Sequence, residues 1–118
     1  MSPFWTLAIC IILCYFIYIF YQLLILENGA YGKRLGLVAD ALGVDNKVVH
    51  FPETSMVSID TLQDILEADQ SWTNVAIVHC ETSSGVINPV EEVGKLVQKY
   101  LPSKYKMVTT NQGGYRLG

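Results

Sequence analysis

The residues best suited to chemistry form two short polar strings, one near residue 30 and one near residue 80. The first string spans residues 28–34 and reads NGAYGKR, and the second spans residues 79–89 and reads HCETSSGVINP. The second string places an imidazole, a thiol, a carboxylate and three hydroxyls side by side in residues 79–84. These are the side chains that nucleophilic catalysis and metal binding use. The two strings are therefore the candidate positions for a functional site.

A Cys–His nucleophile and a metal site are both disfavoured by the spacing of these residues. Neighbours on a strand point to opposite faces, so His79 and Cys80 do not form a catalytic pair easily. No CxxC pair or Cys/His cluster has metal-ligand spacing. We expect Cys10, Cys14 and Cys80 to be free thiols packed as small hydrophobic groups. The segment 29–32 also lacks the spacing of a nucleotide-binding glycine loop. No catalytic residue and no metal ligand is assigned.

The elements that must position the two strings alternate between strand and helix. Apolar or β-branched runs predict strands at 23–26, 47–51, 74–79 and 105–109, and apolar stripes predict helices at 35–42, 60–68 and 88–100. This β-α-β-α-β-α-β order predicts an α/β fold with a parallel sheet and right-handed crossovers. In open sheets of this kind, ligands bind beyond the carboxyl ends of the strands. Both polar strings leave strands at that edge.

The ends of the predicted helices carry recognisable signals. Asn88 is expected to cap the third helix, with Pro89 in its first position. Asp60 and Gln63 have the spacing of a capping box at the start of the second helix. Gly43 is expected to end the first helix. The stripe that this first helix should turn toward the sheet is Leu35, Val38, Ala39 and Leu42.

The N-terminal segment is apolar and has no charged residue between Phe4 and Leu26. As one helix it would span about 34 Å, which exceeds a hydrocarbon core of about 30 Å. We expect a membrane helix from Phe4 to about Tyr21, because no signal-peptide pattern is present. A short buried strand at Leu23–Leu26 is the alternative for its C-terminal end. The expected location is the membrane if 4–26 is an anchor, and otherwise the cytoplasm or mitochondria.

Length and charge limit the classes of function. The chain has 118 residues and a formal net charge of −3. It is long enough for one small domain, and its charge gives no support for a nucleic-acid partner. We divide it into an apolar segment at 1–22, a domain at 23–109 and a Gly-rich tail at 110–118.

The two strings resemble pyridoxal-phosphate aminotransferases, the family that includes 2-aminoethylphosphonate–pyruvate and alanine–glyoxylate aminotransferases. The start of the second string, His79-Cys80-Glu81-Thr82, is closest to the phosphonate enzymes. The resemblance covers about Leu23 to Pro102. It implies part of the large domain of a fold type I enzyme, pyridoxal 5'-phosphate as cofactor, and 2-aminoethylphosphonate and pyruvate as substrates. It also implies a dimer whose active sites lie near the interface.

The resemblance implies cofactor roles for two residues. Tyr31 is similar to the aromatic residue that stacks on the pyridine ring, and Thr82 to the hydroxyl residue that hydrogen-bonds the ring substituents. Without the resemblance, Tyr31 would be an aromatic residue in packing and Thr82 part of a polar turn.

Other parts that the family requires have no counterpart at the expected positions. The strand near Val108 is followed by Thr109-Thr110-Asn111-Gln112, where the family has an aspartate facing the pyridine nitrogen. Membrane-like sequence precedes Leu23, where a phosphate loop is expected, and no lysine matches the one that bonds to the cofactor. We predict a partial transaminase that is inactive alone. The alternatives are a small single-pass membrane protein with a partner-binding remnant, and an alanine–glyoxylate-type fragment.

Overall fold

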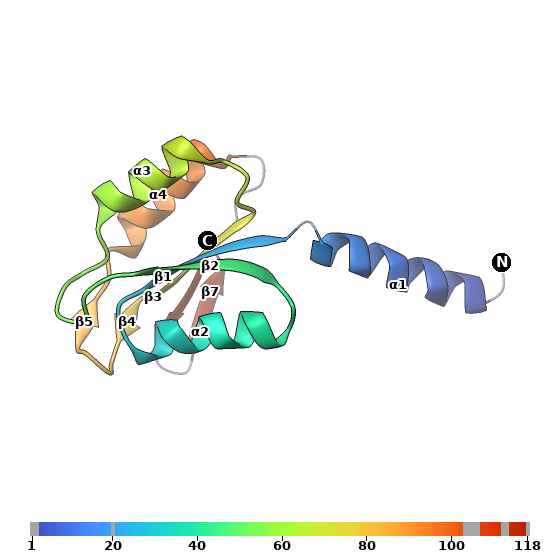
Figure 1. The fold of residues 1–118 in the computed structure, drawn as a ribbon, viewed down its shortest axis with the longest axis horizontal. Coiled ribbons are helices and arrows are strands. Elements are labelled where there is room, and N and C mark those ends of the chain that lie inside the picture. The colour runs from blue at the N-terminus through green and yellow to red at the C-terminus, as the bar shows by residue number, and fades with distance from the viewer. Residues whose placement is uncertain (1–2, 20, 103–106, 112–113, 118) are drawn as a thin grey trace.

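The chain folds around one five-stranded sheet, shown in Figure 1. The computed structural model describes residues 3–19, 21–102, 107–111 and 114–117. The sheet order is β2-β1-β3-β6-β7, with β1 at Gln22–Glu27, β2 at Asp45–His50, β3 at Asn74–Val78, β6 at Met107–Asn111 and β7 at Gly114–Leu117. The first four strands in this order are parallel. The predicted α/β fold with a parallel sheet is therefore confirmed.

Three of the strands, β4 (Cys80–Glu81), β5 (Val86–Ile87) and β7, were not predicted from the sequence. Strand β7 runs antiparallel to β6, in the segment for which we expected only a Gly-rich tail. A small hairpin of β4 and β5 contains the second polar string. Gly85 turns this hairpin with a φ of 76°, a conformation that glycine adopts without a steric penalty. Residues 105 and 106 of the fourth predicted strand lie outside the described residues.

The two faces of the sheet are packed by different helices. Helices α3 (Ile59–Ala68) and α4 (Val90–Tyr100) cover one face, and α2 (Ala30–Ala41) lies on the other (Figure 1). The larger core lies under α3 and α4 and includes Leu24, Leu26, Leu62, Leu66, Val75, Ile77, Val93 and Val97. The smaller one contains Ile25, Ala39 and Ala76. Burial of the larger cluster supplies most of the apolar stabilisation.

Helix α2 approaches the sheet with small residues, and this corrects the predicted stripe. Its buried residues are Gly32, Gly36 and Ala39. A Cβ on Gly36 would lie 2.8 Å from Val48 Cγ2, so the helix sits too close to β2 for a larger residue. Val38 and Leu42, predicted to face the sheet, are 49% and 59% exposed. The apolar periodicity predicted where the helix lies along the chain, but the glycines determine which of its faces packs against the sheet.

Two of the predicted helix caps are also wrong. Ser58 caps α3 by accepting a hydrogen bond from Thr61 N at 3.2 Å, and Asp60 lies inside the first turn. Helix α4 has Pro89 at its N-cap position, and the Asn88 side chain is buried instead of capping. Gly43 follows the end of α2 with a φ of 72°, as expected for a helix C-terminus.

The structure does not support the predicted membrane-spanning helix. The apolar run is divided between α1 (Pro3–Ile19) and the buried strand β1, so the strand alternative for 23–26 is the correct one. Helix α1 has 17 residues. No helix in the described part of the chain is long and apolar enough to cross a membrane.

Candidate functional site

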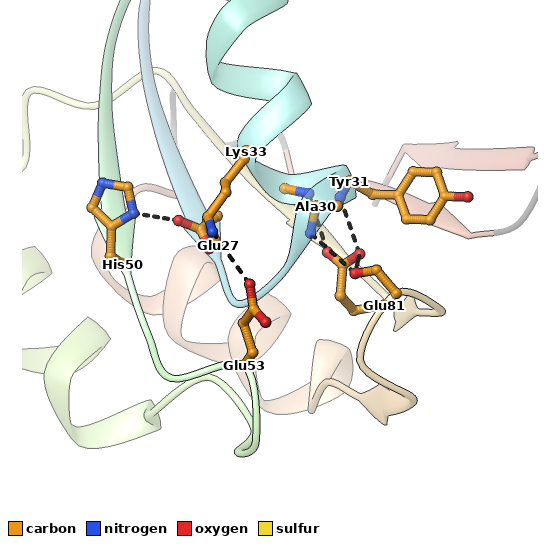
Figure 2. A network of polar contacts seen from close by, with 9 residues as sticks. Glu27, Ala30, Tyr31, Lys33, His50, Glu53 and Glu81 are labelled. Atoms are coloured by element: carbon orange, nitrogen blue, oxygen red, sulfur yellow. Dashed lines mark hydrogen bonds and ion pairs between the residues drawn. The ribbon is translucent and has the colours of Figure 1, made fainter.

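The two polar strings meet at the carboxyl edge of the sheet, as the topology predicted. The first leaves β1 and enters α2, and the second leaves β3 and forms the β4–β5 hairpin. Strands β1 and β3 are neighbours, so their following loops emerge side by side. Figure 2 shows the contacts between these loops.

The Glu81 carboxylate joins the loops by binding the first turn of α2. Tyr31 N donates to one of its oxygens at 3.0 Å, and Gly32 N donates to the other at 3.1 Å (Figure 2). The Glu81 side chain is fully buried. The first N–H groups of a helix have no partner within it, and a carboxylate there also meets the positive end of the helix dipole. Glu81 thus caps a helix that begins fifty residues earlier in the chain.

Ser83 completes this cap at the remaining N–H group. Its Oγ accepts a hydrogen bond from Ala30 N at 3.0 Å and donates to a Glu81 oxygen at 2.8 Å. The N-cap residue of α2 is Gly29, which has no side chain to cap with. We call Glu81 and Ser83, with the backbone N–H groups that they bind, the Glu81–Ser83 clamp.

Glycine at position 29 makes room for the clamp. A Cβ there would lie 2.2 Å from Glu81 Cγ, 2.4 Å from Glu81 Cδ and 2.8 Å from Ser83 Oγ. Gly29 has a φ of 175°, which any residue adopts. The requirement for glycine is therefore steric, imposed by the carboxylate above it.

A buried pair of amide side chains also stabilises the carboxyl edge of the sheet. Asn28 and Asn88 exchange two side-chain hydrogen bonds, at 2.8 and 2.9 Å. Asn88 also accepts from Val57 N and donates to Val78 O, which ties the end of β3 to the loop before α3. Buried amides are stable only when they are bonded in this way. This explains why Asn88 is not available as a helix cap.

The candidate cofactor residues lie on the two clamped segments. Tyr31 is in the first turn of α2 and is 44% exposed. The guanidinium carbon of Arg34 lies over its ring, 5.8 Å from the centroid. Figure 2 shows this ring directed away from Glu81. Thr82 is an exposed residue between Glu81 and Ser83. The structure therefore brings together the backbones that carry Tyr31 and Thr82, and both side chains are accessible.

A second buried carboxylate, Glu27, lies at the end of β1. It is 1% exposed and pairs with Nδ1 of His50, the last residue of the neighbouring strand β2 (Figure 2). Nearby, Lys33 and Glu53 form an exposed ion pair at 3.2 Å. No role was predicted for any of these groups, although a glutamate that ends the apolar run LLILE was a visible signal.

Metal binding and the cysteines add little to this site. Among the described residues, no group of three or more His, Cys, Asp or Glu side chains could hold a metal ion. Cys10 and Cys80 are free, as expected, but Cys10 is exposed and not packed. The Cys14 side chain lies outside what the structure describes.

Comparison with known proteins supports the resemblance over part of the chain. The chain is 44% identical over 77 residues to 2-aminoethylphosphonate–pyruvate transaminase of Syntrophobacter fumaroxidans, covering 65% of this chain and 21% of the relative. The fold resembles pyridoxamine–pyruvate aminotransferase from Mesorhizobium loti, with a TM-score of 0.68 and 26% identity over 76% of this chain and 22% of that one. It also resembles alanine–glyoxylate aminotransferase from Nostoc sp., with a TM-score of 0.66 and 29% identity over 75% and 22% of the two chains. No protein-family model matches the chain.

The chain thus spans about a fifth of the length of the curated relatives it matches. The matched part, about two thirds of this chain, forms an aminotransferase-like sheet with the clamped loops at its carboxyl edge. About two thirds of this chain is therefore similar in sequence to part of a 2-aminoethylphosphonate–pyruvate transaminase, and similar in fold to part of other aminotransferases.

Proposed function

We propose that this chain carries the cofactor-ring part of a 2-aminoethylphosphonate–pyruvate transaminase site. The observation that carries the proposal is the meeting of the Tyr31 and Thr82 segments at the carboxyl edge, where Glu81 binds Tyr31 N. Ligands bind at this edge in open parallel sheets. The relative from Syntrophobacter fumaroxidans, which is 44% identical over the matched part, favours this substrate class.

The cofactor that this edge would serve is pyridoxal 5'-phosphate, and the residues present fit its ring. Tyr31 offers an exposed aromatic face for stacking, and Thr82 offers an exposed hydroxyl for a ring substituent. When bound, the cofactor supplies the electron-withdrawing ring that amino transfer requires. The role of Tyr31 is to fix the plane of the ring, and that of Thr82 is to fix its rotation within that plane.

The complete reaction would move an amino group from 2-aminoethylphosphonate to pyruvate, giving phosphonoacetaldehyde and alanine. This chain has no acid in Thr109-Thr110-Asn111-Gln112, at the end of β6, near the position where the family resemblance implies an aspartate. We therefore propose that the 118-residue chain does not turn over alone. Alanine–glyoxylate chemistry is a second candidate, favoured by the fold match to the Nostoc enzyme at 29% identity.

Cofactor binding tests the proposal directly. The 118-residue chain is titrated with pyridoxamine 5'-phosphate and followed by NMR chemical shifts. This form has no aldehyde, so it cannot bond covalently to surface lysines. We expect shifts confined to the residues around Tyr31 and Thr82. Tyr31→Ala should weaken binding roughly three- to tenfold and Thr82→Ala roughly fivefold.

The matched control is Phe4→Ala, which removes another aromatic ring. Phe4 lies in α1 and is 73% exposed. It should leave the affinity unchanged. Binding that Phe4→Ala weakens as much as Tyr31→Ala would show nonspecific stacking and would contradict the proposal. Alanine formed by the isolated chain from pyruvate and 2-aminoethylphosphonate would contradict the proposed inactivity.

A further inference from the structure

Thr82 stands between two residues that both bind the helix on which Tyr31 lies. Glu81, immediately before it, accepts from Tyr31 N and Gly32 N. Ser83, immediately after it, accepts from Ala30 N. The hydroxyl candidate is therefore fastened on both sides to the first turn that presents the aromatic candidate.

We propose that Glu81 and Ser83 are positioning residues that set the relative placement of Tyr31 and Thr82 for the cofactor ring. This inference rests on the proposed function and adds two residues that neither the sequence nor the family resemblance assigned. A stacking face and a ring-contacting hydroxyl must be held in register to bind one planar ligand. Sites of this kind depend on supporting hydrogen bonds that prevent their ligand-contacting groups from shifting.

The burial of Glu81 makes it a support and not a ligand contact. Its side chain is fully buried, and both of its oxygens already accept backbone hydrogen bonds. Its charge also fills the positive end of the α2 dipole, where an anionic group of a ligand would otherwise bind. The cofactor phosphate is therefore not expected at the N-terminus of α2.

The clamp is constrained by the groups that it contacts. The N–H groups belong to a helix, the Glu81 side chain packs closely against Gly29, and Ser83 Oγ donates to Glu81 at 2.8 Å. Loss of one hydrogen bond should therefore loosen the Tyr31 and Thr82 segments together. This loosening of the two segments should be measurable both in the absence and in the presence of the cofactor.

The test compares Ser83→Ala, Ser83→Thr and Glu81→Gln in the 118-residue chain. Ser83 is exposed, so its substitution leaves the core intact and serves as the variant that still folds. Residual dipolar couplings of the backbone N–H groups in 30–32 and 81–84 report how the two segments are oriented. Amide hydrogen exchange of Ala30, Tyr31 and Gly32 reports the clamp hydrogen bonds individually.

Ser83→Ala should raise Ala30 exchange about tenfold and change the couplings of 81–84 relative to 30–32. Ser83→Thr keeps the hydroxyl and should restore both. Glu81→Gln should raise the exchange of Tyr31 and Gly32 by at least about tenfold, because an amide presents a donor to an N–H. Couplings in β1 and β3 should stay as in the unmodified protein, which separates positioning from general loosening.

Affinity for pyridoxamine 5'-phosphate then links the clamp to the cofactor. Both Ser83→Ala and Glu81→Gln should weaken binding roughly fivefold or more, and Ser83→Thr should restore it. Unchanged couplings in Ser83→Ala and Glu81→Gln would overturn the inference, as would altered couplings with unchanged affinity. If the unmodified chain does not bind the probe at all, the proposed function fails and the cofactor role of the clamp fails with it. If Ser83→Ala and Glu81→Gln still alter the residual dipolar couplings in that case, the clamp has a structural role only.

Discussion

Two buried carboxylates at the carboxyl edge of the sheet are held in different ways. Glu81 is bound by backbone N–H groups of a helix, and Glu27 is bound by the ring of His50, whose side chain is 70% exposed. The backbone donors are held in place by the helix. The imidazole belongs to an exposed side chain on another strand. The Glu81 region is therefore the constrained part of this edge, and the Glu27 region connects it to the surface.

This difference bears on function because only one carboxylate lies between candidate cofactor residues. Glu81 is adjacent to Thr82 and binds the backbone of Tyr31. Glu27 reaches away from both, to the end of β2. A carboxylate with only a structural role can exchange one hydrogen-bond partner for another. A carboxylate that positions ligand-contacting residues cannot do so without displacing those residues.

The largest expected effect comes from the glycines that cover the two carboxylates. Gly29→Ala would place Cβ 2.2 Å from Glu81 Cγ, whereas Gly32→Ala would place it 3.0 Å from Glu27 Cγ and 3.1 Å from Glu27 Cα. Gly29→Ala should lower the free energy of unfolding by at least about 2 kcal/mol, through overpacking and lost hydrogen bonds. Gly32→Ala should lower it less, by about 1 kcal/mol, because its contacts are longer and alanine favours the helix.

Urea unfolding of both variants measures this difference. The two substitutions add the same methyl group three residues apart, so each serves as the control for the other. Equal losses of stability would remove the distinction between a constrained and an adaptable carboxylate. A larger loss for Gly32→Ala would reverse it.

An intermediate effect is expected when each carboxylate becomes an amide. Glu81→Gln should cost about 2 kcal/mol, because the new NH₂ group faces a backbone donor within a fully buried site. Glu27→Gln should cost about 1 kcal/mol or less, because an amide can donate to or accept from a ring nitrogen of His50. Urea unfolding gives both values. A greater loss for Glu27→Gln would show that the His50 pair is the more constrained of the two.

The sequence predicted the layout of this edge but not how it is held together. Strand and helix alternation follows from local apolar patterns, and parallel topology then places both polar strings at one edge. Glu81 and Tyr31 N are fifty residues apart, so their pairing depends on the register of β1 and β3. No local pattern could show that Glu81 would cap a helix whose own N-cap is a glycine.

The errors made from the sequence have a common physical cause. Asn88 stands at a position typical of a helix cap, but its side-chain amide instead forms hydrogen bonds with the buried side chain of Asn28. Val38 and Leu42 matched a helical stripe, but Gly36 allowed α2 to approach β2 and turned them outward. In each case a tertiary contact overrode a local preference.

The smallest expected effect concerns Glu67, whose carboxylate is exposed, unlike the buried carboxylates of Glu81 and Glu27. The Tyr100 hydroxyl donates to Glu67 Oε1 at 2.8 Å and lowers the pKa of Glu67, with a second contribution from Gln63. Because the folded-state pKa is lowered, this bond stabilises the fold above the pKa of the unfolded chain. The stabilisation is lost as the pH falls through the folded-state pKa. Tyr100→Phe should raise the Glu67 pKa toward the ordinary glutamate value, and Gln63→Ala should raise it less. Carboxyl NMR titration measures both, and an unmoved pKa in Tyr100→Phe would show that solvent already replaces the hydroxyl at this exposed site.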